Sequence, residues 1–141
     1  EIDYHWKCQL MGHEVWVEPA SVIYHKGAVT LPVSSPRKTY LNYRNSLILL
    51  LTNYPISKSL YLFFPRLFME CVSLIKELIT FKWGHAFSII KSWVWIMGHF
   101  GRLKQRRKFL KDKNIIIPRL IYSQSIVKKY FVQGKKYFSQ I

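Results

Sequence analysis

The apolar stretches after residue 56 are interrupted by basic residues before they are long enough to cross a membrane. Residues 60–64, 87–90 and 93–97 are rich in apolar side chains, but Arg66 follows the first stretch and Lys91 separates the other two. A membrane-spanning helix needs about 20 consecutive, mostly apolar residues. The pattern is instead typical of amphipathic helices that lie in the headgroup layer, with basic side chains in water and aromatic rings at the boundary.

Charge is unevenly distributed along the 141 residues, which carry 22 Lys+Arg, 7 Asp+Glu and a formal net charge of +15. Residues 57–141 hold seventeen of the basic side chains and only three of the acidic ones. Such a segment indicates a polyanionic partner, either nucleic acid or an anionic membrane surface. The membrane surface is favoured and nucleic acid is not expected, because the basic residues lie among apolar ones and no nucleic-acid-binding motif is present. Packed helices with a solvated basic face are the other alternative.

The first 35 residues predict a helix followed by two short strands. Apolar residues recur at helical spacing over residues 1–11, and Gly12 fits a C-terminal cap. Apolar and polar residues alternate over residues 14–18, and residues 22–25 form a second short apolar run, so both segments are expected to be strands. Residues 27–35 are expected to form a loop.

The rest of the chain predicts helices. Ser35 followed by Pro36 is a favourable helix start, and Pro55 is expected to end that helix. Further helices are expected over residues 59–80 with a bend at Pro65, over residues 84–113, and, more weakly, over residues 123–138.

An ordered series of motifs runs through the first 45 residues. It comprises residues 1–3 (EID), 6–7 (WK), 10–13 (LMGH), 17–25 (VEPASVIYH) and 36–45 (PRKTYLNYRN). Together these motifs closely resemble the acceptor-side segment of family 2 glycosyltransferases, including its rhamnosyltransferase-like members. The resemblance covers about residues 1–54, and the basic, helical remainder is typical of the variable tail of that family.

The resemblance implies an α/β fold class, in which the chain is the C-terminal fragment of a Rossmann-like GT-A domain. Residues 1–54 would be the acceptor-side part of the catalytic domain, with one helix and a short strand pair. Residues 55–141 would be a basic, amphipathic, helical tail that associates with membranes. The donor-binding half, with its Asp-x-Asp motif, would precede residue 1, so the fragment alone is expected to be inactive.

The resemblance also implies roles for individual residues. Glu1 matches the catalytic base and Asp3 a downstream acid that shapes the site or binds the acceptor, whereas Lys7 replaces a common Arg. His25 matches a His that either helps to ligate a divalent metal, Mg²⁺ or Mn²⁺, or contacts the donor diphosphate. The main ligands of the metal would lie upstream. The alternative for Glu1 and Asp3 is a charge at a helix start that interacts with the helix dipole. For His25 it is a hydrogen-bonded side chain at a strand end.

The residue chemistry agrees with these roles. An inverting transfer needs one base to accept the proton of the acceptor hydroxyl, and a carboxylate with a pKa of about 4.3 is ionised at neutral pH. Cations stabilise the leaving diphosphate. Lys26, Arg37 and Lys38 are candidates for this contact on charge and position, and the resemblance adds Lys7 as a candidate for binding the diphosphate or the substrate. Arg37 and Lys38 could equally face solvent or headgroups.

The sequence therefore predicts an inverting glycosyltransferase that uses a nucleotide-sugar donor and a lipid-linked glycan acceptor. Its expected location is peripheral, at the cytoplasmic face of the bacterial inner membrane, because a lipid-linked acceptor is confined to such a surface. The alternative is a non-catalytic, basic module that binds a membrane surface.

Overall fold

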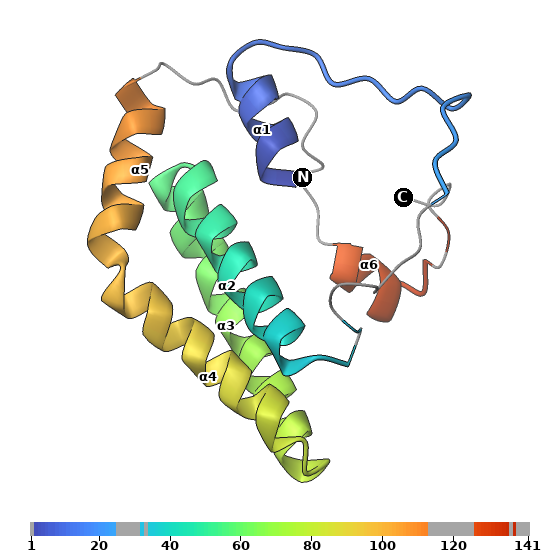
Figure 1. Ribbon diagram of the computed structural model, residues 1–141, viewed down its shortest axis with the longest axis vertical. Coiled ribbons are helices and arrows are strands. Elements are labelled where there is room, and N and C mark those ends of the chain that lie inside the picture. The colour runs from blue at the N-terminus through green and yellow to red at the C-terminus, as the bar shows by residue number, and fades with distance from the viewer. Residues whose placement is uncertain (1, 25–31, 33, 113–125, 136, 138–141) are drawn as a thin grey trace.

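The computed structural model describes the chain except residues 1, 25–31, 33, 113–125, 136 and 138–141. The described part contains six helices and no strand (Figure 1). The helices are α1 (Ile2–Leu10), α2 (Pro36–Asn53), α3 (Ile56–Ile79), α4 (Trp83–Gly98), α5 (Phe100–Asp112) and α6 (Ile126–Phe131).

The prediction of an α/β fold is wrong, because helices account for 75% of the described residues and none of these residues forms a sheet. Residues 14–18, which were expected to be a strand, follow an irregular path, and so do residues 22–24, the described part of the strand expected over residues 22–25. An isolated strand pair is marginally stable in water unless one face is buried. Trp16 and Val17 would point to opposite faces of such a strand, yet they are 83% and 86% exposed. Within the described part of the chain neither face has a surface to pack against, so alternation alone does not produce a sheet.

Helix α1 and its C-terminal cap agree with the prediction. Gly12 has a φ of 85°, a left-handed conformation that glycine adopts without steric cost. The amide of Gly12 donates to the carbonyl of Gln9 at 3.1 Å, and the amide of His13 donates to that of Cys8 at 2.9 Å. This is the Schellman arrangement, which satisfies carbonyls at a helix end.

Helices α2 to α5 form the packed part of the molecule. Helix α2 packs against α3, α4 and α5, and α3 packs against α4 (Figure 1). Their core is a cluster of Leu47, Ile96 and Leu103, bordered by four partly buried residues, Ile48, Leu51, Trp93 and Trp95. Beyond this cluster, Ala86 and Ile89 are the other buried hydrophobic residues of the described part. Because this core is small, polar contacts between the helices matter for stability.

The boundaries of α2 and α3 are close to those expected. Helix α2 begins at Pro36, although the Ser35 side chain forms no capping hydrogen bond, and it ends just before Pro55. Helix α3 begins at Ile56, three residues earlier than predicted, and continues through Pro65. A proline removes the donor to the carbonyl four residues earlier. Here that residue is the exposed Tyr61, whose carbonyl can be hydrated.

The helix predicted over residues 84–113 is two helices, because the chain departs from helical geometry at His99, where φ is −115°. The amide of His99 still bonds to the carbonyl of Trp95 at 3.1 Å, and its ring stacks on the Trp95 ring with centroids 4.1 Å apart. Figure 1 shows α5 continuing from α4 in a new direction. The last predicted helix is shorter than expected, spanning Ile126–Phe131, and five of the sixteen residues of its predicted range lie outside the described residues.

Candidate functional site

Asp3 anchors α1 to the ends of two other helices. Arg106 on α5 donates from Nη2 to both carboxylate oxygens at 2.7 Å, and Asn53 at the end of α2 donates from Nδ2 at 3.0 Å. Lys7, one turn further along α1, places its Nζ 2.8 Å from Oδ2. The carboxylate therefore joins residues that are 50 and 103 positions away in the sequence.

These contacts determine the ionisation of Asp3. Burial raises the pKa of the carboxyl group, but hydrogen bonds from Lys7, Asn53 and Arg106 outweigh that effect and lower the pKa to about 2. An efficient general base has a pKa near the working pH. A carboxylate held by three donors is thus better suited to positioning α1 than to accepting a proton.

A second contact holds the same helix. The rings of Trp6 and Tyr54 meet edge to face, with centroids 4.8 Å apart and an interplanar angle of 81°. Tyr54 follows α2 directly, so the aromatic pair and Asp3 both join α1 to the C-terminal end of α2. Trp6 packs in this junction, whereas Trp16 is exposed and its indole N–H donates to Glu14 at 2.9 Å.

The structure brings together only some of the predicted site residues. Asp3 and Lys7 form an ion pair. Arg37 and Lys38 lie in the first turn of α2, about 24 Å from the Asn53 end at a rise of about 1.5 Å per residue. The remaining predicted site residues, Glu1, His25 and Lys26, lie outside the described residues.

The described residues provide no metal-ligand set, since no three of their His, Cys, Asp or Glu side chains gather in one place. His25, the only candidate ligand predicted in this chain, is not among them.

The C-terminal end of α2 is completed by α5 and α3. Arg107 on α5 donates from Nη1 to the carbonyl of Leu51 and from Nη2 to that of Tyr54, the latter at 2.6 Å. Ser59 on α3 donates to the carbonyl of Leu50 at 2.8 Å. Burial lowers the pKa of the Arg107 guanidinium from its usual value, but arginine remains charged in proteins. The positive charge of Arg107 also interacts favourably with the negative end of the α2 dipole.

A buried carboxylate that the sequence did not reveal connects three helices. Glu70 on α3 is 1% exposed, and its Oε1 lies 2.7 Å from Nε of Arg66. The indole N–H of Trp93 on α4 donates to its other oxygen, and Nη2 of Arg66 donates to Ser46 on α2 at 2.8 Å. The four-residue spacing of Arg66 and Glu70 within an apolar helix was the available signal, since such pairs share a helix face.

Cations and aromatic rings alternate along the junction of α2 and α4. The Arg44 guanidinium lies 5.2 Å from the Tyr40 ring centre and 5.1 Å from that of Trp95. Lys91 lies 5.3 Å from the same Tyr40 ring, and Trp95 stacks on His99. We call these five residues the cation–aromatic ladder. Within the described part of the chain, no carboxylate forms an ion pair with Arg44 or Lys91.

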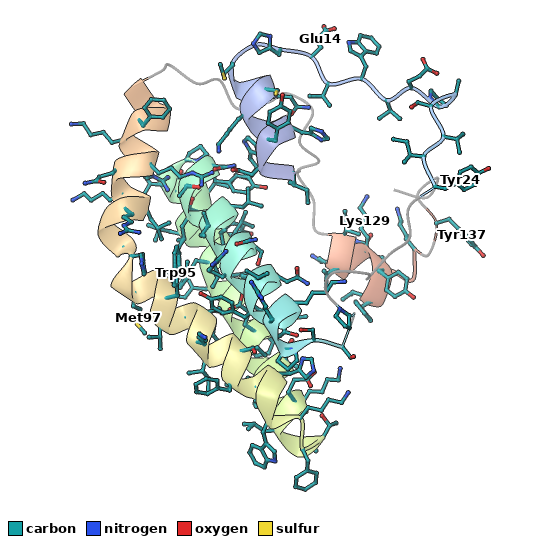
Figure 2. All side chains as sticks on the ribbon, in the orientation of Figure 1. Glu14, Tyr24, Trp95, Met97, Lys129 and Tyr137 are labelled. Atoms are coloured by element: carbon teal, nitrogen blue, oxygen red, sulfur yellow. The ribbon has the colours of Figure 1, made fainter. Side chains whose placement is uncertain are left out.

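Helix α4 exposes an apolar stripe beside this ladder. The stripe consists of large side chains that are 41% to 69% exposed, namely Trp83, Phe87, Ile90, Val94 and Met97. In Figure 2, Met97 points to the outer side of α4, whereas Trp95 lies on the side that faces α2. Over the described residues, none of the helices combines the length and the apolarity that a transmembrane span requires.

Comparisons of the chain with family models, with curated proteins and with solved structures find no match.

Proposed function

We propose that this chain provides the acceptor-side segment and tail of an inverting glycosyltransferase, which transfers a sugar from a nucleotide donor to a lipid-linked glycan. The observation that carries the proposal is the ordered motif series over residues 1–45. Several motifs in one order are a more specific signal than any single motif. The activity belongs to a polypeptide whose donor-binding part, by the same resemblance, precedes residue 1.

In this proposal Glu1 is the base that accepts the proton of the acceptor hydroxyl, and Asp3 positions the helix that carries it. Support comes from the anchoring of α1, which has only nine residues. Isolated helices of this length are unstable in water. The contacts of Asp3 with Arg106 and Asn53 would hold α1, and with it the adjacent base, in one place.

The residues that would bind the sugar-nucleotide donor are proposed from their positive charge. Lys26, Arg37 and Lys38 would contact the leaving diphosphate, as cations do where negative charge develops. A divalent cation, Mg²⁺ or Mn²⁺, would supply further charge stabilisation when bound. His25 is the candidate ligand in this chain, with the main ligands upstream. The enzyme would work at the cytoplasmic face of a bacterial inner membrane.

The test uses the full-length enzyme with Glu1→Gln. Loss of a positioned general base lowers the rate by roughly 10²- to 10⁴-fold. Transfer is expected to fall by that factor while donor affinity, measured by calorimetry, stays within about twofold, a change of about 0.4 kcal/mol. The matched control is Glu14→Gln, an exposed glutamate of the irregular segment, which should leave transfer unchanged. Undiminished transfer in Glu1→Gln would remove the residue from the base role.

The second candidate is a non-catalytic, basic module that binds a membrane surface, and the exposed stripe of α4 favours it. The two candidates differ in one measurement. A full-length protein that binds membranes but neither binds nor consumes any nucleotide sugar would support the module and contradict the transferase.

A further inference from the structure

We infer that the outer face of α4 is a docking surface for an anionic phospholipid membrane, on which the helix lies parallel to the lipid surface. The inference deepens the proposed function, because it names the partner that would keep the enzyme beside a lipid-linked acceptor. It rests on the proposed function only in this respect. The surface consists of the apolar stripe of α4 together with Lys91 and Arg44.

The first step is the division of α4 into two faces. The stripe residues follow one another at intervals of four, three, four and three, which keeps them on a single side of a helix. The opposite side is buried against the bundle through Ala86, Ile89, Ser92 and Ile96. Helix α4 is therefore anchored on one side and apolar on the other, and the exposed side needs a partner.

The second step is the position of the cations. Lys91 follows the stripe residue Ile90 directly and is exposed, so its ammonium lies beside the apolar stripe. The ring of Tyr40 on α2 lies 5.3 Å from the Lys91 ammonium and 5.2 Å from the Arg44 guanidinium, so an aromatic ring and a second cation border this side of α4. An apolar stripe bordered by basic and aromatic side chains matches the layers of a membrane interface, where acyl chains lie beneath phosphates.

The third step is the choice of occupant. Residues 57–141 hold seventeen basic and three acidic side chains, so two copies of this segment repel each other. An anionic lipid surface attracts the same charge, with each basic residue near the surface contributing. Charge complementarity thus favours lipid over a second copy of the chain.

The experiment measures binding of the 141-residue chain to vesicles by co-sedimentation. Vesicles of phosphatidylcholine alone are compared with vesicles that also contain phosphatidylglycerol. The chain is expected to bind the anionic vesicles more tightly, and added salt is expected to weaken that binding. Equal affinity for both kinds of vesicle, or no binding, would overturn the inference.

A matched pair of variants locates the surface. Val94→Glu places a charge in the middle of the stripe and is expected to weaken binding by about tenfold or more. Val17→Glu is the same change at an exposed valine of the irregular segment and should have little effect. Both positions are exposed, so circular dichroism should show an unchanged helix content. Equal losses in the two variants would contradict the assignment to α4.

Lys91→Gln tests the charge separately. It is expected to reduce affinity for anionic vesicles about fivefold and to leave any binding to neutral vesicles unchanged. The chain could instead form a dimer in solution without vesicles. If Val94→Glu dissociates such a dimer, the stripe is an interface between two copies, and its assignment to a membrane is overturned. Sugar transfer is measured independently of vesicle binding. A full-length enzyme that transfers sugar normally to a soluble acceptor but does not bind vesicles would contradict this inference and leave the proposed function intact.

Discussion

Asp3 shows how one side chain gains its role from residues far away in the sequence. By itself it is an acidic residue in the first turn of a short helix, where its negative charge interacts favourably with the positive end of the helix dipole. The structure adds Arg106 and Asn53 as partners and thereby turns the carboxylate into the link between α1 and the bundle.

The first prediction concerns Asp3→Asn and its pH dependence. The pKa of Asp3 is lowered from 3.8 to about 2. The stabilisation is therefore complete above about pH 4 and disappears as the pH falls towards 2. The group is 33% exposed, so solvent screening reduces the full linkage energy of about 2.5 kcal/mol to about 1 kcal/mol.

Urea unfolding of the original chain and of Asp3→Asn, at neutral pH and at several acidic pH values, measures the difference between their free energies of unfolding. The variant should be less stable at pH 7 and should approach the original chain near pH 2. Glu14→Gln serves as the control, with little change expected. A gap between the two proteins that stays constant with pH would show that the carboxylate charge is not responsible.

At the scale of the helices, the turn between α3 and α4 contains the one non-glycine residue with a positive φ in the described part of the chain. Phe81 has a φ of 55°. Its amide donates to the carbonyl of Leu78 at 3.1 Å, and that of Lys82 donates to Glu77 at 2.9 Å. This is the same helix-ending arrangement that Gly12 forms, but here a side chain occupies the strained position.

The second prediction compares Phe81→Gly with Phe81→Ala. Both variants lose the exposed ring and its edge contact with Trp83, so their difference isolates the strain of the Cβ atom. The left-handed conformation costs roughly 1–2 kcal/mol for a residue with a Cβ. We expect the glycine variant to be about 1 kcal/mol more stable than the alanine variant in thermal or urea unfolding. An alanine variant of equal or greater stability would contradict this.

Helix packing also depends on Glu70, whose carboxylate joins α3 to α4 directly and to α2 through Arg66. The third prediction is that Glu70→Ala lowers the free energy of unfolding by about 2 kcal/mol, because it leaves the partly buried Trp93 N–H without its acceptor. The loss is below that of a fully buried ion pair, since Arg66 is 40% exposed and can be hydrated.

Glu70→Gln is the matched comparison for that network. It keeps an oxygen for Trp93 but removes the charge that pairs with Arg66, so a loss of about 1 kcal/mol is expected. Denaturant unfolding of the two variants should rank the glutamine form above the alanine form. The reverse order would show that filling the space at position 70 matters more than its hydrogen bonds.

At the scale of the whole molecule, the core crosses the division predicted between residues 1–54 and 55–141. Leu47 on α2 packs with Ile96 on α4 and Leu103 on α5. The division of the chain into these two domains stays a prediction, and the packing across it makes the prediction testable.

The fourth prediction is that residues 55–141 alone do not keep the fold of the full chain. Removing α2 exposes Ile96 and Leu103, and burial of such side chains contributes about 2 kcal/mol each to domains that are stable by about 5–15 kcal/mol. Circular dichroism and urea unfolding of the shorter chain should show reduced helicity and no sharp transition. A transition with an unchanged midpoint would mean that α2 is dispensable.

Much of the helical part was determined by the sequence itself. The start of α2 at Pro36, its end before Pro55 and the cap at Gly12 depend on backbone preferences of single residues, which act locally. The position of the charges relative to the apolar stretches is likewise a property of the order of residues along the chain.

Other features were decided only by tertiary structure. Residues 14–18 alternate like a strand, but a strand needs a partner edge and a surface to cover, and neither is present in the described part. The pairing of Asp3 with Arg106 also requires groups brought together from different helices. Local sequence sets which backbone conformations are favourable, whereas burial and pairing depend on neighbours that only the packed helices provide.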